Sequence, residues 1–456
     1  MKRRAPEAGR SRSTRPPESV DTITIDRVAA GGDGVGRLRG LAVFVPRTAP
    51  GDVAQIAYTT HGRHARGRVL QLLEASPLRV APRCRHYEAD RCGGCQLQHL
   101  EASAQRRVRQ EIVQDSLRRI GGREIPLPAI ASAAPWGYRG RLTLTLQRRG
   151  TGWVGGLHPH DDPTRIFPLE ECAIAHPALV TVWGAIRPLL HANTPALPDA
   201  ASLRLSVRLD DAGAGLGAEP TVSLVITGGR TWGARESWAE AVRHADGRIR
   251  HVLWTPETPP AGLAGAASET GPGAKEAMAF AQVNAGVADT LRTFVFGEVM
   301  AMTPRLVIDG YAGTGRLATQ LAEAGVNVVA IEADAAGAAA GEARARAAGS
   351  AVATRVRVVC DLVERALLRL EGPVAHPEVV VLNPPRRGVD VVVTRWLEHE
   401  APRSVRAVVY VSCDPGTLAR DLARLPSWRV AAVQCFDMFP QTAHVETVCV
   451  LRRESP

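Results

Sequence analysis

The C-terminal part of the chain alternates short apolar runs with glycine, proline and polar residues. Four of these runs cover residues 306–308, 326–331, 379–382 and 407–411. Between the first two, residues 317–324 carry apolar side chains at helical spacing. Buried strands that alternate with helices are typical of an open parallel sheet with helices on both faces. The pattern therefore predicts a doubly wound, Rossmann-like α/β domain over residues 276–456.

The pattern differs in the N-terminal half of the chain. From 19 to 76, short β-rich runs alternate with glycine-rich turns such as residues 31–34, and this predicts a small β-barrel. Residues 77–275 have a mixed pattern and are predicted to form a β-rich central domain. There, residues 106–120 show the apolar spacing of an amphipathic helix. Residues 142–146 alternate between leucine and threonine, as a half-buried strand does.

A glycine-rich turn follows the first C-terminal strand, in the sequence DGYAGTG at 309–315. Glycines at such a turn let the backbone approach a ligand, and an acidic residue about 20 positions further on binds ribose hydroxyls. Glu332 lies at that position. The glycines do not follow the GxGxxG order of dinucleotide-binding proteins, and S-adenosylmethionine, which has a ribose but no pyrophosphate, fits better. A purely structural turn is the alternative.

A cysteine and a carboxylate form the second candidate centre. Cys413 follows the run 407–411 and precedes Asp-Pro-Gly, which must turn the chain. Its thiol is therefore expected at the end of a core strand, where open α/β sheets bind ligands. Glu446 comes later, in MFPQTAHVE, and the two side chains suit a nucleophile and a base. A buried structural cysteine is the alternative for Cys413.

Four further cysteines occur in the predicted central domain, at Cys84, Cys92, Cys95 and Cys172. Four thiolates suit either a structural zinc or an iron-sulfur cluster, and their spacing does not decide between them. Disulfide pairing is disfavoured, because no secretory signal precedes the chain and the cytosol keeps thiols reduced. The remaining cysteines lie in or beside apolar runs and are predicted to be core residues: Cys360, Cys435 and Cys449.

The composition favours a polyanionic partner. The chain has 56 Lys and Arg against 46 Asp and Glu, a net charge of +10, which favours nucleic acid, although a GC-rich genome also raises arginine content. Residues 1–18 are basic and almost free of apolar side chains, so we expect a disordered arm and not a signal peptide. No run of about 18 apolar residues occurs, so no membrane span is expected. We expect a cytoplasmic monomer.

Five segments together carry a family resemblance. They are FAQVN at 280–284, DGYAGTG at 309–315, NPPRRG at 383–388, YVSCDPGTLARDL at 410–422 and MFPQTAHVE at 438–446. In this order they resemble the RNA uracil-5-methyltransferases, and the resemblance covers nearly the whole chain. It implies S-adenosylmethionine-dependent methylation of carbon 5 of a uridine in structured RNA, in ribosomal RNA more than in transfer RNA.

The resemblance also implies roles for single residues. Cys413 would add to carbon 6 of uracil, which makes carbon 5 nucleophilic, and Glu446 would remove the proton from carbon 5. The residues implied to bind the cofactor are Gln282, Tyr311, Gly313, Glu332, Asp361 and Asn383. The four central cysteines would hold a 4Fe-4S cluster, although seven residues separate the first two where the family more often has five. The N-terminal barrel resembles the RNA-binding TRAM module.

Departures from the family pattern leave two alternative functions open. Asn383 stands where the family more often has Asp, and Arg316 stands where smaller polar residues are common. A strand that ends in Asn-Pro-Pro also resembles methyltransferases that act on exocyclic amino groups. A non-catalytic iron-sulfur RNA-binding protein is the second alternative. The presence of both Cys413 and Glu446 in their full motifs favours carbon methylation over both.

Overall fold

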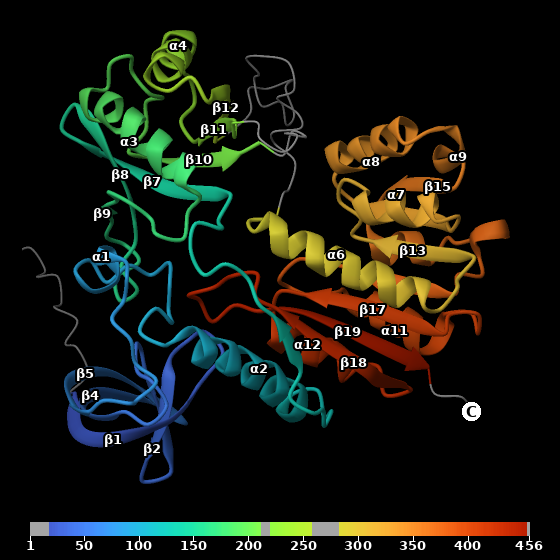
Figure 1. Cartoon of the computed structure of the whole chain (residues 1–456), viewed down its shortest axis with the longest axis horizontal. Helices are drawn as coiled ribbons and strands as arrows, with labels where there is room; N and C mark the ends of the chain where they lie inside the picture. The colour runs from blue at the N-terminus through green and yellow to red at the C-terminus, as the bar shows by residue number, and fades with distance from the viewer. Residues whose placement is uncertain (1–17, 211–218, 258–281, 454–456) are drawn as a thin grey trace, which may run out of the picture. The chain divides into compact units, whose positions relative to one another are not determined.

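The computed structural model describes residues 18–210, 219–257 and 282–453. The chain divides into two compact units, Met1–Val80 and Ala81–Pro456 (Figure 1). Most of the predicted basic arm and the first two residues of FAQVN lie outside the described residues. None of the helices in these described stretches has the length and apolar character needed to cross a membrane. The finer predicted boundaries, after residues 18, 76 and 275, stay predictions.

The first unit contains a closed barrel of five strands in the spatial order β1-β2-β3-β5-β4. The strands are β1 (Ser19–Val28), β2 (Gly34–Leu38), β3 (Leu41–Val45), β4 (Val53–His61) and β5 (His64–Glu74). Inward-facing side chains such as Ile23, Val43 and Ile56 form its core. At Gly36, strand β1 passes so closely that a side chain would overlap the carbonyl oxygen of Thr24. The predicted small β-barrel is thus present.

The second unit contains a six-stranded sheet in the order β12-β11-β10-β7-β8-β9. Its strands are β7 (Arg141–Arg149), β8 (Gly152–Leu157), β9 (Phe167–Pro168), β10 (Ser202–Leu209), β11 (Val222–Thr227) and β12 (Ile249–Thr255). The buried leucines of β7 pack with helices α3 (Pro177–Ala192) and α4 (Arg235–Ala245), while the intervening threonines are only half-buried. This confirms the alternation predicted for residues 142–146. The short helix α1 (Arg85–Glu88) precedes this sheet in the chain.

An eight-stranded sheet follows, in the order β15-β14-β13-β16-β17-β19-β18-β6 (Figure 1). Its strands are β6 (Ala129–Ala131), β13 (Leu306–Gly310), β14 (Asn327–Glu332), β15 (Val356–Cys360), β16 (Val379–Leu382), β17 (Ala407–Ser412), β18 (Trp428–Phe436) and β19 (Glu446–Arg453). Strands β13 to β17 pair in parallel, and β19 is antiparallel to both β17 and β18. The predicted doubly wound α/β architecture is confirmed.

Helices cover both faces of this sheet because successive strand residues point in opposite directions. Ile308 and Val408 face one core together with helices α10 (Val363–Leu367), α11 (Val391–Arg395) and α12 (Pro415–Leu422). Val307 and Val409 face the other core with α6 (Ala285–Met300) and α7 (Arg316–Glu323). The remaining helical segments are α8 (Ala335–Ala347), α9 (Ser350–Ala353), a 3-10 turn at Gly372–Val374 and a π-helical turn at Trp396–Glu400.

Two elements from much earlier in the chain join the eight-stranded sheet. The predicted amphipathic helix is α2 (Ala102–Arg119), and it packs against α12. Its Val113 and Leu117 belong to the same core as Leu418. Strand β6 pairs in parallel with β18, where Ala129 is the partner of Gln434. The segment that follows the cysteine-rich region is therefore part of the layer that carries the catalytic motifs.

Candidate active site

The candidate site residues follow the carboxyl ends of neighbouring parallel strands. In the register, Gly310 at the end of β13 pairs with both Ile331 of β14 and Leu382 of β16. Leu382 in turn pairs with Tyr410 of β17. The residues that come next in the chain at these ends include Tyr311, Glu332, Asn383 and Cys413. They lie along one edge of the sheet, which is where open α/β sheets bind ligands.

The conformation of the glycine-rich turn is stabilised by hydrogen bonds to Glu332. One oxygen of its carboxylate accepts a hydrogen bond from the Gly313 amide at 2.7 Å, and the other accepts from the Asp334 amide at 2.8 Å. Gly313 has φ +56°, and no atom lies within 4 Å of the position that its side chain would take. Tyr311 also has a left-handed backbone, with φ +64°. The turn thus exposes backbone to open space beside an acidic side chain.

The other predicted cofactor residues lie at the same edge or just before α6. Asp361 follows β15, and its carboxylate pairs with Arg369 at 3.3 Å. Asn383 is exposed, and its backbone N–H donates to the Gly310 carbonyl at 3.2 Å. Gln282 begins the third described stretch, half-buried, two residues before Asn284 caps α6. The roles of these residues in cofactor binding stay predictions.

Cys413 and Glu446 lie at the same end of the neighbouring strands β17 and β19. The last pair in the antiparallel ladder between β17 and β19 is Ser412 with Thr447. Cys413 directly follows the first of these residues, and Glu446 directly precedes the second. The register therefore brings together two residues that are far apart in the sequence. It places a thiol and a carboxyl group at the same end of the sheet as the glycine-rich turn.

Burial controls the protonation of both side chains. Glu446 is 3% exposed, and burial raises its pKa from 4.5 to about 7, against the opposing effect of Arg386. Burial, followed by the charge of Glu446, raises the pKa of the Cys413 thiol, and Arg386 again opposes the rise. Arg386 is therefore the cation that favours the charged forms of both groups. Its role was not predicted from the sequence, although it lies three residues beyond the strand tip at Asn383.

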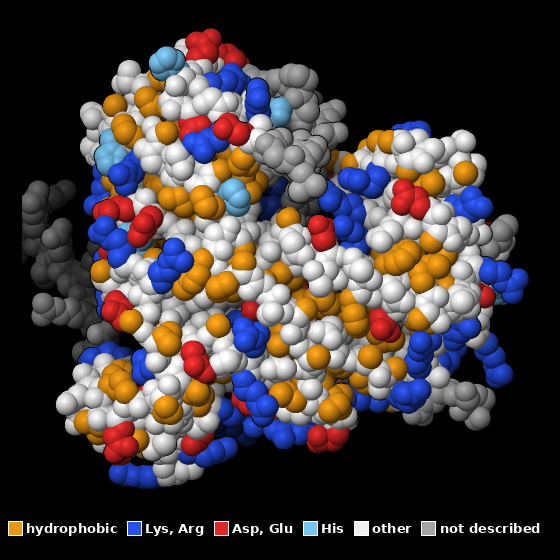
Figure 2. All heavy atoms as spheres, in the orientation of Figure 1, with side chains coloured by type: hydrophobic (Ala, Val, Ile, Leu, Met, Phe, Trp, Pro, Cys, Tyr) orange, Lys and Arg blue, Asp and Glu red, His pale blue; other side chains and the backbone are white. Residues whose placement is uncertain are grey.

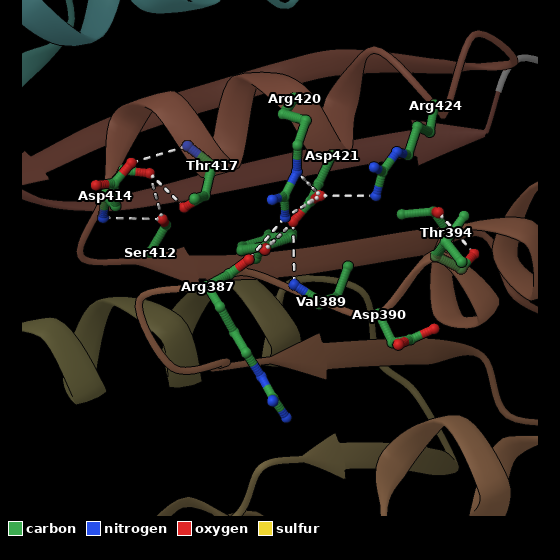
Figure 3. Close-up of polar contacts among 12 residues, drawn as sticks. Arg387, Val389, Asp390, Thr394, Ser412, Asp414, Thr417, Arg420, Asp421 and Arg424 are labelled. Carbon is green, nitrogen blue, oxygen red and sulfur yellow. Dashed lines mark hydrogen bonds and ion pairs between the residues drawn. The ribbon is translucent and has the colours of Figure 1, made fainter.

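Asp421 joins the NPPRRG segment to the helix that follows Cys413 (Figure 3). It is fully buried in α12. Its carboxylate accepts hydrogen bonds from the Val389 amide at 3.0 Å and from the Tyr410 hydroxyl at 2.8 Å. Arg420 contacts the same carboxylate at 2.8 Å and donates to the Arg387 carbonyl at 2.7 Å. Asp421 was not predicted as a site residue. The only indication in the sequence is that an acidic residue stands near the end of YVSCDPGTLARDL, between apolar and basic neighbours.

The turn directly after Cys413 is fixed by its own side chains (Figure 3). Asp414 caps α12 by accepting a hydrogen bond from the Thr417 amide at 2.8 Å. The Ser412 hydroxyl accepts from the Asp414 amide at 3.2 Å. A capped helix that begins two residues after the thiol limits how far the thiol can move.

The four central cysteines line one cavity of about 130 Å³. Burial raises the pKa of Cys95 to about 12, a Gln98 hydrogen bond opposes the rise, and the charges of the other three thiols add to it. Among the described residues, no three His, Cys, Asp or Glu side chains are arranged to hold a single metal ion. Four cysteines that line one cavity are suited to hold either a zinc ion or an iron-sulfur cluster.

One cysteine lies elsewhere than predicted. Cys360 is exposed, so the prediction that it belongs to the core was wrong. It ends β15, which is the edge strand of the eight-stranded sheet and is covered less than the central strands. Cys435 and Cys449 are buried, as predicted.

Comparison with known proteins identifies the family. Residues 274–454 match the family model described as tRNA (Uracil-5-)-methyltransferase. An uncharacterized RNA methyltransferase of Thermosynechococcus vestitus is 32% identical over an alignment of 467 positions. The alignment covers 94% of this chain and 97% of that protein. The 23S rRNA (uracil(1939)-C(5))-methyltransferase RlmD of Thiobacillus denitrificans is 30% identical over 462 residues, covering 95% and 99%. The chain belongs to the RNA uracil-5-methyltransferase family.

The fold agrees with this family. The crystal structure of Pyrococcus abyssi tRNA (uracil-54, C5)-methyltransferase in complex with S-adenosyl-L-homocysteine superposes with a TM-score of 0.64 at 22% identity, over 94% of this chain and 99% of that one. The protein is thus an RNA uracil-5-methyltransferase, and the family resemblance seen in its motifs is confirmed. The two alternative functions, amino-group methylation and non-catalytic RNA binding, have no support among these relatives.

Proposed function

We propose that this RNA uracil-5-methyltransferase methylates a uridine of structured ribosomal RNA, and not of transfer RNA, through a covalent bond between Cys413 and the base. The mechanism is supported above all by the positions of Cys413 and Glu446 beside the last residue pair, Ser412 and Thr447, of neighbouring strands. The ribosomal substrate is supported by two relatives named as 23S rRNA (uracil(1939)-C(5))-methyltransferases, at 30% and 31% identity.

The proposed reaction begins at Cys413. Its thiolate adds to carbon 6 of uracil, so that a carbon–sulfur bond forms and an electron pair moves toward carbon 5. Carbon 5 would then attack the methyl group of S-adenosylmethionine, so that a carbon–carbon bond forms, the methyl–sulfur bond breaks and S-adenosylhomocysteine leaves. Glu446 then removes the proton from carbon 5, the electron pair returns, and the carbon–sulfur bond breaks to release the RNA.

The electrostatics of the site support these roles. Arg386 favours the thiolate form of Cys413 and the carboxylate form of Glu446. A carboxyl group with a pKa of about 7 both accepts and releases a proton at neutral pH, which is what a general base requires. The burial of Glu446 also keeps water away from the proton that it has accepted.

The cofactor would lie along the sheet edge, held by Gln282, Tyr311, Gly313, Glu332, Asp361 and Asn383. The open space beside Gly313 supports this proposal, because a ligand can approach the backbone there without meeting a side chain. Asn383 is neutral where the family more often has a carboxylate, so it would contact the ligand as an amide that both donates and accepts.

We also propose that Cys84, Cys92, Cys95 and Cys172 hold a 4Fe-4S cluster. The cavity that all four thiols line supports a shared metal site, and the family resemblance favours a cluster over a single zinc ion there. Anaerobically purified protein should be brown and contain iron and sulfide, and Cys92→Ser should bleach it. Cys435→Ser, which changes a buried cysteine outside the cavity, should keep the colour. Colourless wild-type protein with stoichiometric zinc would rule out the cluster.

The N-terminal barrel is proposed to act as an RNA-binding module of the TRAM type. Its support is the closed five-stranded architecture together with the family resemblance. That the protein is a cytoplasmic monomer stays a prediction, which sedimentation of the purified protein and localisation of a tagged protein would check.

The proposed reaction is tested by replacing the nucleophile. Ribosomal and transfer RNA from cells that lack this gene would be incubated separately with S-adenosylmethionine and either wild-type protein or Cys413→Ala. We expect 5-methyluridine at one site of ribosomal RNA with the wild type and none with the variant, which should still bind S-adenosylmethionine. Methylation by Cys413→Ala would disprove the covalent mechanism, and methylation of transfer RNA alone would disprove the ribosomal substrate.

A further inference from the structure

The segment between β18 and Glu446, residues 437–445, is held in place by side chains from distant parts of the chain. Gln441 lies in its middle, is 3% exposed, and has a left-handed backbone with φ +71°. A residue other than glycine adopts this conformation only where its surroundings hold it. The contacts of Gln441 therefore show what holds the segment.

Gln441 and Gln105 of α2 form a reciprocal pair. The backbone amide of Gln441 donates to the side-chain oxygen of Gln105 at 3.0 Å. The side-chain amide of Gln105 donates to the side-chain oxygen of Gln441 at 2.9 Å and to the Leu100 carbonyl at 2.9 Å. Gln105 is also 3% exposed. Neither amide has water to replace its partner, so loss of either side chain leaves buried polar groups unpaired.

The carbonyl of Gln441 is engaged as well. It accepts from the backbone amides of Gln96 at 3.2 Å and Leu97 at 2.9 Å, the two residues that directly follow Cys95. The neighbouring Pro440 carbonyl accepts from the Tyr138 hydroxyl at 2.9 Å. The segment that leads to Glu446 is thus joined to α2 and to the cysteine-bearing stretch at the same residue.

Glu446 begins β19 five residues after Gln441. Within the sheet, its backbone is fixed by the pairing of Glu446 with Phe436 of β18 and of Thr447 with Ser412 of β17. On the other side, the approach of the chain is fixed by residues 437–445. The angle at which the carboxyl group meets its substrate therefore depends on both.

We propose that Gln105 and Gln441 are a positioning pair, which holds residues 437–445 so that Glu446 can reach the proton on carbon 5. This inference rests on the proposed function of Glu446 as the base. The pair does not touch the thiol or the cofactor edge in any contact described above. Its loss should therefore slow the elimination step and leave addition and methyl transfer largely intact.

The test compares Gln105→Leu with Gln110→Leu. Both glutamines lie in α2, and Gln110 is half-buried and donates to the Pro128 carbonyl at 2.7 Å, away from residues 437–445. We expect Gln105→Leu to lower kcat by about 10- to 100-fold, as loss of a supporting hydrogen bond does. KM values for RNA and for S-adenosylmethionine should change by less than about twofold. Gln110→Leu should keep the kcat of the wild type.

A substituted substrate separates positioning from general damage. In RNA that contains 5-fluorouridine, fluorine replaces the proton on carbon 5 and a base cannot remove it, so the adduct forms and stays. Gln105→Leu should form this adduct at the wild-type rate. With ordinary RNA, the same variant should accumulate an adduct that survives denaturation, which wild-type protein and Gln110→Leu should not.

Gln441→Gly provides a second variant that should fold, because glycine adopts a left-handed backbone without strain. It removes the side-chain pairing. Like Gln105→Leu, it should form the adduct at the wild-type rate and release it slowly. Equal turnover in Gln105→Leu and Gln110→Leu, or slow formation of the 5-fluorouridine adduct in both Gln105→Leu and Gln441→Gly, would overturn the positioning role.

Failure of the proposed function gives a different result. Wild-type protein would then form neither 5-methyluridine nor the 5-fluorouridine adduct. In that case amide hydrogen exchange decides whether the pair holds the segment. Faster exchange over residues 437–446 in Gln105→Leu than in Gln110→Leu would support the pair, and equal exchange would overturn it.

Discussion

The carboxyl group of Glu446 lies in a buried position beside a thiol, and this position controls when the group carries charge. Burial favours the neutral form, while Arg386 favours the charged form. The result is a group that changes protonation near neutral pH, where an ordinary glutamate is fully ionised. Burial raises the pKa of this base, and for the same reason ionisation of the group lowers the stability of the folded protein.

Glu446→Gln should therefore change how stability depends on pH. The pKa of Glu446 is raised in the folded protein, so the neutral group stabilises the fold below pH 4.5, and this contribution is lost as pH rises through about 7. The rise from 4.5 to about 7 corresponds to about 3 kcal/mol. Glutamine stays neutral, so the variant should be more stable than the wild type above pH 7. Urea unfolding at several pH values would measure the free energy of unfolding of both proteins. If this free energy changed with pH in the same way for the two proteins, the prediction would be contradicted.

Glu446→Gln should also trap the protein on its RNA. Addition of Cys413 and methyl transfer need no base at carbon 5, so they should proceed, whereas elimination should stop. The expected product is a methylated protein–RNA adduct that withstands denaturation and is seen as a shifted band in a denaturing gel. Cys413→Ala in the same background should abolish the band. Normal turnover without an adduct would remove Glu446 from the role of base.

At the scale of elements, the motifs depend on a few side chains that tie one segment to another. Asp421 connects α12, the end of β17 and the NPPRRG segment (Figure 3). The strands and most helices were predictable from the sequence, because buried strands are continuous apolar runs bounded by turn residues. Asp421 and Gln441 were not predictable. Asp421 bonds to Tyr410, 11 residues away, and Gln441 bonds to Gln105, 336 residues away, and apolar periodicity does not indicate such pairs.

Asp421→Asn should loosen this connection. Val389 and Tyr410 donate to one carboxylate oxygen, and Arg420 and Arg424 contact the other. The single oxygen of asparagine can still accept from Val389 and Tyr410, but these bonds lose the strength that the charge gives them. The asparagine NH2 group then faces the two arginines, whose ion pairs contribute little because both side chains are partly exposed. We expect a loss of about 1–3 kcal/mol in unfolding free energy.

The control for this variant is Asp390→Asn, which changes an exposed carboxylate that caps α11. Asparagine caps helices about as well as aspartate, so the control should be nearly neutral. Urea unfolding of the two variants beside the wild type would measure the difference. Equal midpoints would show that Asp421 does not hold these segments together.

At the scale of the whole molecule, the sequence predicted the kinds of architecture but not how the parts combine. The closed barrel and the doubly wound sheet both follow from local periodicity. The entry of α2 and β6 into the eight-stranded layer does not, because it depends on pairing between residues about 300 positions apart, such as Ala129 and Gln434. Basic side chains are scattered over the face drawn in Figure 2. Contacts with RNA phosphates are thus expected to be spread over several elements.

Removal of residues 1–80 tests how much the first unit contributes to RNA binding. The cut follows Arg79, because this residue and Ser76 still bond to the buried Asp52 of the barrel. If the basic arm and the barrel contact phosphates, affinity should fall, and the slope of log K against log salt should become shallower by about one for each lost contact. Methyl transfer at saturating RNA should survive better than affinity, because Cys413 and Glu446 lie in the second unit.

A milder variant separates lost contacts from a lost unit. Exchange of the exposed Arg37 and Arg39 for glutamine leaves the barrel strands in place and should reproduce part of the change in slope, since each neutralised arginine that contacts a phosphate releases fewer counterions. Binding of ribosomal RNA would be measured at several salt concentrations for both variants and the wild type. An unchanged slope and affinity after removal of residues 1–80 would assign the first unit to another role than RNA recognition.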